Sequence, residues 1–185
     1  MSITDFTKPT PMIVDFISEL KPGDALDIGA GNGRNSLYLA ENGWAVDALD
    51  IDENALRHID EVSRKKSLLV HTILQDFMRH ETPRQYDVIL CLMTLHFLSQ
   101  QDIKLAIDWM KVHTKPGGTI VISGFNSRNA IGARPYLFSN NELAELFTEW
   151  TIIHYEDDSP SSILSKSTQK IETYHVSRIV AKKPY

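Results

Sequence analysis

The sequence predicts an α/β protein with a doubly wound, mostly parallel sheet and one antiparallel strand near the C-terminus. Segments typical of strands and of helices alternate five times along the chain, and such alternation builds a parallel sheet with helices on both faces. The segment YDVILCL at 86–92 is nearly all apolar, as a central parallel strand is. Two strand-like segments follow each other at the end of the chain, so one of them is expected to be antiparallel.

The elements of the first half are identified from their apolar periodicity and from the turn residues between them. Asp52 is expected to cap a helix, because its carboxylate can accept the unpaired N–H groups of the first turn. The predicted order is a helix at 10–20, a strand at 25–28, a helix at 33–42, a strand at 44–50, the helix capped by Asp52, and strands at 68–74 and 86–92.

The second half continues the same alternation. Ser99 is expected to cap a helix, since apolar residues at 103, 106, 107 and 110 share one helical face. The remaining predicted elements are a turn at Pro116-Gly117-Gly118, a strand at 119–125, a helix at about 143–150, and strands at about 151–156 and 171–181 joined by the polar stretch DDSPSSILSKSTQ.

The composition is that of an ordinary globular chain. The 185 residues, of which 42% are hydrophobic and 23% charged, predict a single domain spanning 1–185. A net charge of −5 argues against nucleic acid as a partner, and no segment resembles a membrane helix or a signal peptide. The seven histidines show no metal-site spacing, so we expect no metal. The single cysteine suits a cytoplasmic protein.

The segment ALDIGAGNGRNSLYLAENG at 25–43 places three glycines between a strand and a helix. Gly29, Gly31 and Gly33 would let a ligand approach the backbone closely, and the helix start behind them favours a negative group. Asp50 follows the second strand, 19 residues after Gly31, where a carboxylate can accept both hydroxyls of a ribose. We therefore predict a nucleoside site, although a glycine turn can also serve simply to join a strand to a helix.

Two cofactor classes use this geometry. Dinucleotide-binding proteins have the pattern G-x-G-x-x-G, whose third glycine would fall at position 34, where this chain has Arg34. The chain instead has G-x-G-x-G preceded by Asp27, which is the pattern of methyltransferases that use S-adenosylmethionine (SAM). A carboxylate buried in a strand is costly without a partner, which favours a functional role for Asp27 over a structural ion pair. A nicotinamide-dependent oxidoreductase stays open as the less favoured alternative.

The segment GRNSLYLA at 33–40, followed by Asn-Gly and an aromatic residue, resembles the tellurite-resistance methyltransferases of the TehB type. The segments YDVILCLMTLHFL, MKVHTKPGG and FSNNELAELFTEW agree with later parts of that family, so the resemblance extends from about Ala25 to Lys183. It implies a class I methyltransferase (Rossmann-like) fold, SAM as the cofactor, and a small-molecule methyl acceptor such as tellurite or a selenium compound.

The resemblance also implies a set of cofactor-binding residues. Class I methyltransferases place an acidic residue after the third strand against the adenine amino group, with an apolar neighbour near the ring, and Asp76 and Phe77 match these positions. Cys91 is expected to be a small buried residue rather than a reactive thiol. The complete predicted cofactor set is Asp27, Gly29, Gly31, Gly33, Asn35, Asp50, Ile51, Asp76, Phe77 and Cys91.

Several residues that would lie near the substrate differ from those of the family. A late His-Arg pair of the family corresponds to Ser165 and Lys166, and a following Arg corresponds to Lys170. His96 occupies a position that is apolar in the family. These departures favour a neutral or thiol-like acceptor over tellurite, and they keep a non-catalytic SAM-binding module open as an alternative.

The predicted catalytic residues surround the end of the fourth strand and the loop after the fifth. A base is needed only if the acceptor must lose a proton, and His96 is the candidate, unless it simply packs within LHFL. Arginines after the fifth strand could hold an anion, unless they are ordinary loop residues. The candidates are Thr94, His96, Arg128 and Arg134. We expect a small-molecule acceptor as the partner, with the chain a monomer or a homodimer.

Overall fold

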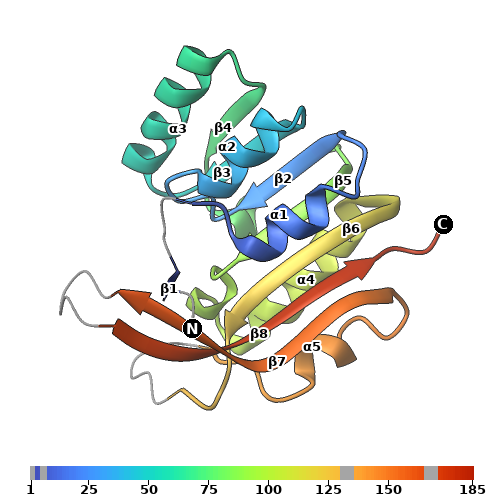
Figure 1. Cartoon of the computed structure of the whole chain (residues 1–185). Helices are drawn as coiled ribbons and strands as arrows, with labels where there is room; N and C mark the ends of the chain where they lie inside the picture. Colours follow the sequence, from blue (N-terminus) through green and yellow to red (C-terminus); the bar gives the residue numbers. More distant parts are fainter. Residues whose placement is uncertain (1–2, 5–7, 130–135, 165–170) are drawn as a thin grey trace.

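In the computed structural model, residues 3–4, 8–129, 136–164 and 171–185 are described. Eight strands among these residues form one sheet in the order β1-β7-β8-β6-β5-β2-β3-β4 (Figure 1). Neighbouring strands are parallel except in the two pairs that β8 makes, with β6 and with β7. The predicted mostly parallel sheet with one antiparallel strand near the C-terminus is therefore confirmed.

The bounds of the elements follow the predicted alternation closely in the first two thirds of the chain. The strands are β1 (Ile3–Thr4), β2 (Asp24–Ile28), β3 (Ala45–Asp50), β4 (Val70–Leu74), β5 (Tyr86–Leu92), β6 (Thr114–Phe125), β7 (Thr151–Leu164) and β8 (Ile171–Lys182). The helices are α1 (Pro11–Ile17), α2 (Arg34–Glu41), α3 (Glu53–Lys66), α4 (Gln100–His113) and α5 (Glu142–Glu145), with short 3₁₀ helices η1 (Phe77–Arg79) and η2 (Leu95–Phe97).

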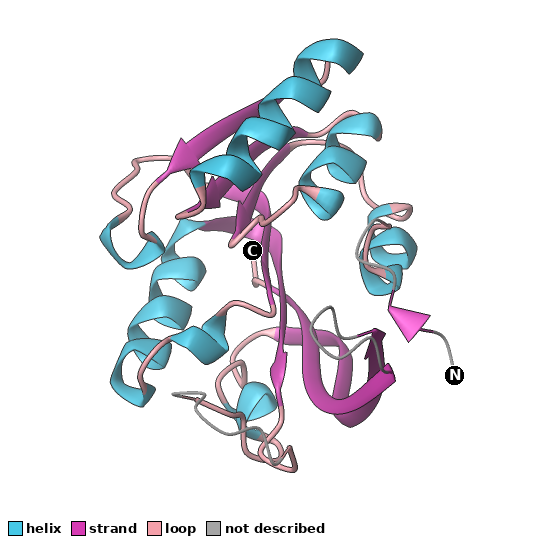
Figure 2. Ribbon diagram, turned by 90° about the vertical axis from the view of Figure 1, so that its left-hand side faces the viewer, coloured by secondary structure: helices cyan, strands magenta, loops and turns pink. Residues whose placement is uncertain are grey.

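Helices cover both faces of the sheet, as Figure 2 shows. On one face, α1 and α2 pack on alternate apolar residues of the central strands, such as Leu90 of β5 and Val121 of β6. The helix α3 packs beside α2 through Ile59. On the other face, α4 and α5 cover the intervening residues, including Ile89 and Ile120. The carboxyl ends of the parallel strands thus meet at one edge of the sheet, between the two helical layers.

The predicted helix at about 143–150 is wrong in length, because α5 ends at Glu145. Its apolar pattern still predicts burial, and Phe147 is fully buried. The backbone N–H groups of Phe147 and Trp150 donate to carbonyls three residues earlier, at 3.1 and 2.9 Å, which tightens the chain into turns. The Lys111 ammonium donates to the Leu146 carbonyl, which satisfies a group that a longer helix would have bonded internally.

Two strands are longer than predicted. The polar stretch expected to join the last two strands instead continues β7 as far as Leu164. A bulge at Asp157-Asp158, between the pairs Glu156–Arg178 and Ser159–Val176, restores the register with β8. In β6 the predicted Pro-Gly-Gly turn is an irregularity within the strand, since Tyr86 pairs with Thr114 and Val88 with Thr119.

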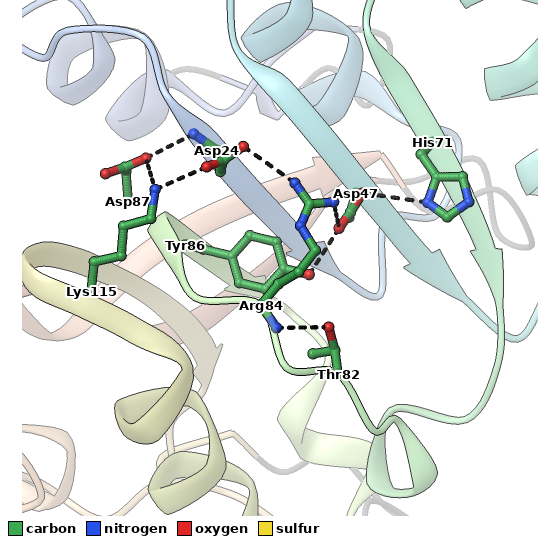
Figure 3. A network of polar contacts seen from close by, with 8 residues as sticks. All are labelled: Asp24, Asp47, His71, Thr82, Arg84, Tyr86, Asp87 and Lys115. Carbon is green, nitrogen blue, oxygen red and sulfur yellow. Dashed lines mark hydrogen bonds and ion pairs between the residues drawn. The ribbon is translucent and has the colours of Figure 1, made fainter.

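Charged side chains join β2, β3, β5 and β6 toward their amino ends (Figure 3). Buried Asp47 accepts hydrogen bonds from Arg84 at 2.7 Å and from the Tyr86 hydroxyl at 2.8 Å. Lys115 donates to Asp24 at 2.8 Å, and this hydrogen bond lowers the pKa of the Asp24 carboxyl. The network lies away from the carboxyl edge of the sheet, so we assign it to holding the strands together.

Candidate cofactor site and acceptor edge

The chain leaves β2 through a turn of three left-handed glycines. Gly29, Gly31 and Gly33 have φ angles of +71°, +54° and +77°, a region that side chains disfavour. The N–H groups of Gly29 and Ala30 donate to the carbonyl of Leu49 at 2.8 and 3.1 Å. The turn is therefore fixed to the end of the neighbouring strand β3 before α2 begins.

The three glycines are required for different reasons. A Cβ atom at Gly29 would lie 2.2 Å from the Thr94 hydroxyl oxygen, and one at Gly33 would lie 2.4 Å from a carbon of Ile59. A Cβ atom at Gly31 would have no neighbour within 4 Å. The outer two positions are therefore glycine because of packing inside the protein, whereas Gly31 borders open space where a ligand can approach the backbone.

Asp50, the last residue of β3, reaches the glycine turn directly. One carboxylate oxygen accepts the Gly31 N–H at 2.7 Å, and the other accepts the Asp52 N–H at 2.9 Å. Asp52 in turn caps α3 by accepting the N–H of Asn54 at 2.9 Å. Each carboxylate oxygen of Asp50 keeps further acceptor capacity, so the group is held in place and remains able to bind hydroxyl groups.

Asp27 lies beneath the turn in β2 and is almost fully buried. It accepts a hydrogen bond from the Ser36 hydroxyl of α2 at 2.6 Å. Burial raises the pKa of Asp27 to about 6, against the opposing effects of the Ser36 hydrogen bond and the Arg34 charge. Its neutral partner is thus a hydroxyl from the helix that follows the turn, a contact that the sequence reasoning did not anticipate.

Asn35 has a contact that the sequence did not suggest. Its side-chain oxygen accepts the backbone N–H of Thr10 at 2.9 Å. Thr10 immediately precedes α1, whose Pro11 occupies the first helical position. Asn35 therefore connects the helix behind the glycine turn to the segment that leads into α1, and its predicted contact with the cofactor stays a prediction.

The remaining predicted cofactor residues lie around the same edge of the sheet and differ in their burial and their contacts. Asp76 follows β4 and caps η1 by accepting the Met78 N–H at 3.0 Å. Phe77 is buried edge-on against Trp109, with ring centroids 5.1 Å apart. Ile51, directly after β3, is 75% exposed. Burial raises the pKa of the Cys91 thiol, which agrees with the expected inert, buried residue.

Thr94 and His96 follow β5 at the carboxyl edge. The Thr94 hydroxyl donates to the carbonyls of Ile28 and Leu92 at 3.2 and 3.3 Å, so it lies against the start of the glycine turn. Met93, just before it, has a φ of +55°, which marks a sharp bend at this point. His96 is buried in η2 beside Phe97. The structure thus brings Thr94 to the glycine turn, with His96 two residues further on.

Arg128, the predicted anion-binding residue, is engaged with a carboxylate. Its guanidinium forms an ion pair with Asp158 of the β7 bulge, and His175 of β8 lies 2.6 Å from the same carboxylate. Asp158 has a φ of +59°. Sequence reasoning missed Asp158 and His175, because only the bulge in β7 brings them together. Arg134, Ser165, Lys166 and Lys170 lie outside the described residues.

The described part of the chain has neither a cluster of metal-binding side chains nor a membrane-spanning helix. No group of three or more histidine, cysteine or carboxylate side chains there could hold a metal ion. Within the same residues, every helix is too short or too polar to span a membrane.

Comparisons with known proteins point to one family and one fold. Residues 4–170 match the family described as tellurite resistance protein TehB. The chain is 30% identical over 149 residues to the probable S-adenosyl-L-methionine-dependent methyltransferase TehB of Haemophilus influenzae, a match that covers 79% of this chain and 52% of the relative. The chain therefore spans about half the length of the relatives that it matches.

Solved structures show the same likeness. The crystal structure of TehB from Haemophilus influenzae matches with a TM-score of 0.87 at 27% identity, covering 94% of this chain and 62% of that one. The 1,6-didemethyltoxoflavin-N1-methyltransferase of Burkholderia thailandensis, with bound 1,6-didemethyltoxoflavin and S-adenosylhomocysteine, matches with a TM-score of 0.73 at 22% identity, covering 95% of this chain and 77% of that one. The second likeness shows the fold alone.

Proposed function

Since the chain belongs to the TehB family of tellurite-resistance proteins, we propose that it is a SAM-dependent methyltransferase acting on a small molecule. The observation that carries the proposal is the open side of Gly31 beside the carboxylate of Asp50. A backbone that a ligand can touch, next to a fixed acceptor for two hydroxyl groups, fits a nucleoside with an attached chain.

The fit to SAM rests on this chain's own residues. The glycine turn leaves room along the backbone at Gly31, and Asp50 would accept the ribose hydroxyls. Asp76 would lie toward the adenine, because β4 pairs with β3 and the Gln75 N–H donates to the Asp50 carbonyl at 3.1 Å. When bound, SAM supplies a methyl group on a positively charged sulfur, which is already activated for transfer.

The protein's contribution to the reaction is then alignment and exclusion of water. Thr94 lies against the glycine turn and begins the η2 segment that carries His96. We assign to His96 the role of accepting a proton from the acceptor where the acceptor has one to lose. Because Arg128 is already paired with Asp158, the proposal favours a neutral or thiol-like acceptor over a tellurium or selenium oxyanion.

The test is binding followed by a single turnover. Calorimetry is expected to give binding of SAM and of S-adenosylhomocysteine, with no detectable binding of NAD or NADH. A single-turnover assay with methyl-labelled SAM and a panel of thiols, hydroxyls and amines is expected to give a labelled product. Binding of NAD comparable to that of SAM would overturn the proposal, and SAM binding without transfer to any acceptor would make the chain a binding module.

A further inference from the structure

Four aromatic rings form a row along the carboxyl edge of the sheet. His96 and Phe97 of η2 have ring centroids 4.2 Å apart, and His96 lies 4.7 Å from Phe125 at the end of β6. Phe125 lies 5.3 Å from Tyr174 of β8. The row therefore crosses from the segment after β5, over β6, to β8, which are consecutive strands of the sheet.

The row begins at the cofactor site. Thr94, which precedes η2, contacts the glycine turn closely enough that a Cβ atom at Gly29 would lie 2.2 Å from its hydroxyl oxygen. The Phe97 N–H donates back to the Thr94 carbonyl at 3.1 Å, which places the backbone of Phe97 next to Thr94. A molecule lying on these rings would therefore be adjacent to a ligand lying along the turn.

The outer rings of the row are more exposed than the inner rings. Phe97 is 61% exposed, whereas His96 and Phe125 are buried. Tyr174 is half-buried, and its hydroxyl donates to Glu172. The Phe97 ring packs on His96, which packs in turn on Phe125, and flat ligands stack on exposed aromatic rings by offset or edge contacts.

We propose that the methyl acceptor carries an aromatic ring, which stacks on Phe97 with its nucleophilic oxygen, nitrogen or sulfur directed toward Thr94 and the glycine turn. This inference rests on the proposed methyltransferase function and names the acceptor class for it. In the transfer, the acceptor heteroatom forms a bond to the methyl carbon, and the carbon–sulfur bond breaks with its electron pair remaining on sulfur. The acceptor's proton leaves to His96 or to water.

The experiment compares two thiols, one with a flat ring and one with a puckered ring, and the rates are compared after correction for the larger thiolate fraction of the aromatic thiol. Phenylmethanethiol and cyclohexylmethanethiol have the same nucleophilic group and nearly the same size. Binding of each to the protein saturated with S-adenosylhomocysteine is measured by calorimetry, and methylation of each is measured as kcat/KM with SAM. Tellurite is the third acceptor. We expect the aromatic thiol to bind and react about tenfold better than the saturated one, the size of effect that ring stacking supplies.

Substitutions at Phe97 test whether the preference for the aromatic thiol depends on the ring of this residue. Phe97→Leu keeps an apolar side chain but removes the flat face, so it is expected to abolish the preference for the aromatic thiol. Phe97→Tyr is expected to retain it. The matched control is Leu105→Ala on the outer side of α4, where Leu105 is 60% exposed, almost the same as Phe97; this variant should leave the preference unchanged.

The outcomes separate the two proposals. If S-adenosylhomocysteine does not bind, the methyltransferase function itself fails. If it binds but the two thiols bind and react equally, or neither binds, the aromatic acceptor is overturned while the methyltransferase function stands. Faster methylation of tellurite than of the aromatic thiol, or an unchanged preference in Phe97→Leu, would also overturn it.

Discussion

The Asp50 carboxylate accepts the N–H of Gly31 at 2.7 Å and so joins the end of β3 to the tip of the glycine turn. Asp50→Asn keeps the size of the side chain but replaces one acceptor oxygen with a donor. Two N–H groups of the protein and two hydroxyls of a ribose then compete for one remaining oxygen. We expect the affinity for SAM, measured by calorimetry, to fall by about 1–3 kcal/mol, or roughly 5- to 150-fold.

The control for this prediction is Asp108→Asn, which removes a carboxylate paired with Lys104 on the surface of α4. It should leave the affinity for SAM unchanged. Unchanged affinity in Asp50→Asn as well would mean that the ribose is held elsewhere.

Alanine substitutions at Gly31 and Gly33 distinguish a glycine needed for ligand contact from one needed for packing inside the protein. Both residues are left-handed, so alanine costs about 1–2 kcal/mol of strain at either position. Only Gly33→Ala adds a clash, with Ile59 at 2.4 Å, whereas Gly31→Ala meets no atom within 4 Å. Gly33→Ala is therefore expected to lower the melting temperature more, while Gly31→Ala keeps the fold but loses most of its affinity for SAM. A Gly31→Ala variant that binds SAM normally would show that no ligand lies against this residue.

Asp27 predicts a dependence of stability on pH. Burial raises its pKa from 3.8 to about 6, so the folded protein holds a proton that the unfolded chain releases between these values. The contribution of Asp27 to the free energy of unfolding therefore falls as pH rises from about 4 to 6, by roughly 3 kcal/mol, and stays low above pH 6. The free energy of unfolding is measured by urea denaturation at several pH values for the wild-type protein and for Asp27→Asn. The variant keeps an acceptor for the Ser36 hydroxyl, but it should not show the fall in stability between about pH 4 and 6. Parallel pH profiles for the two proteins would contradict it.

The fold was predictable because its signals are local. Apolar periodicity along 25–113 depends on residues a few positions apart, and the structure confirms each strand and helix predicted there. The bulge at Asp157-Asp158 was not predictable, because a polar stretch reveals no register until β8 pairs with it. The contact of Asp158 with His175 depends on that register, and so the partner of Arg128 was also missed.

The same distinction applies to the site. The glycine turn and the position of Asp50 beside it could be predicted because their spacing follows directly from a strand–turn–helix unit. Their individual roles were not visible in the sequence, since they depend on Thr94 and Ile59, which approach from other elements. The same is true of the hydrogen bond between Asn35 and Thr10.

Arg84 is expected to matter for stability and not for binding. It donates to the buried carboxylate of Asp47 at 2.7 Å, toward the amino ends of the strands. Arg84→Met leaves Asp47 with the Tyr86 hydroxyl and with His71 at 3.4 Å but without this guanidinium, which is expected to lower the free energy of unfolding by about 1–3 kcal/mol. Urea denaturation measures this loss, and calorimetry should give an unchanged affinity for SAM. A large loss of affinity in a variant that is still folded would mean that the network also supports the site.

The last prediction separates His96 as a proton acceptor from His96 as a packed ring. His96→Phe keeps a ring between Phe97 and Phe125 but removes both nitrogens. If His96 takes the acceptor's proton, kcat for a protonated thiol falls by about 100-fold or more, while kcat for a thiophenol that is already ionised at the assay pH stays nearly unchanged. Since both acceptors need the same alignment, a packing defect would lower both rates together. Equal losses for the two acceptors, or no loss for either, would remove His96 from the chemistry and leave it as part of the aromatic row.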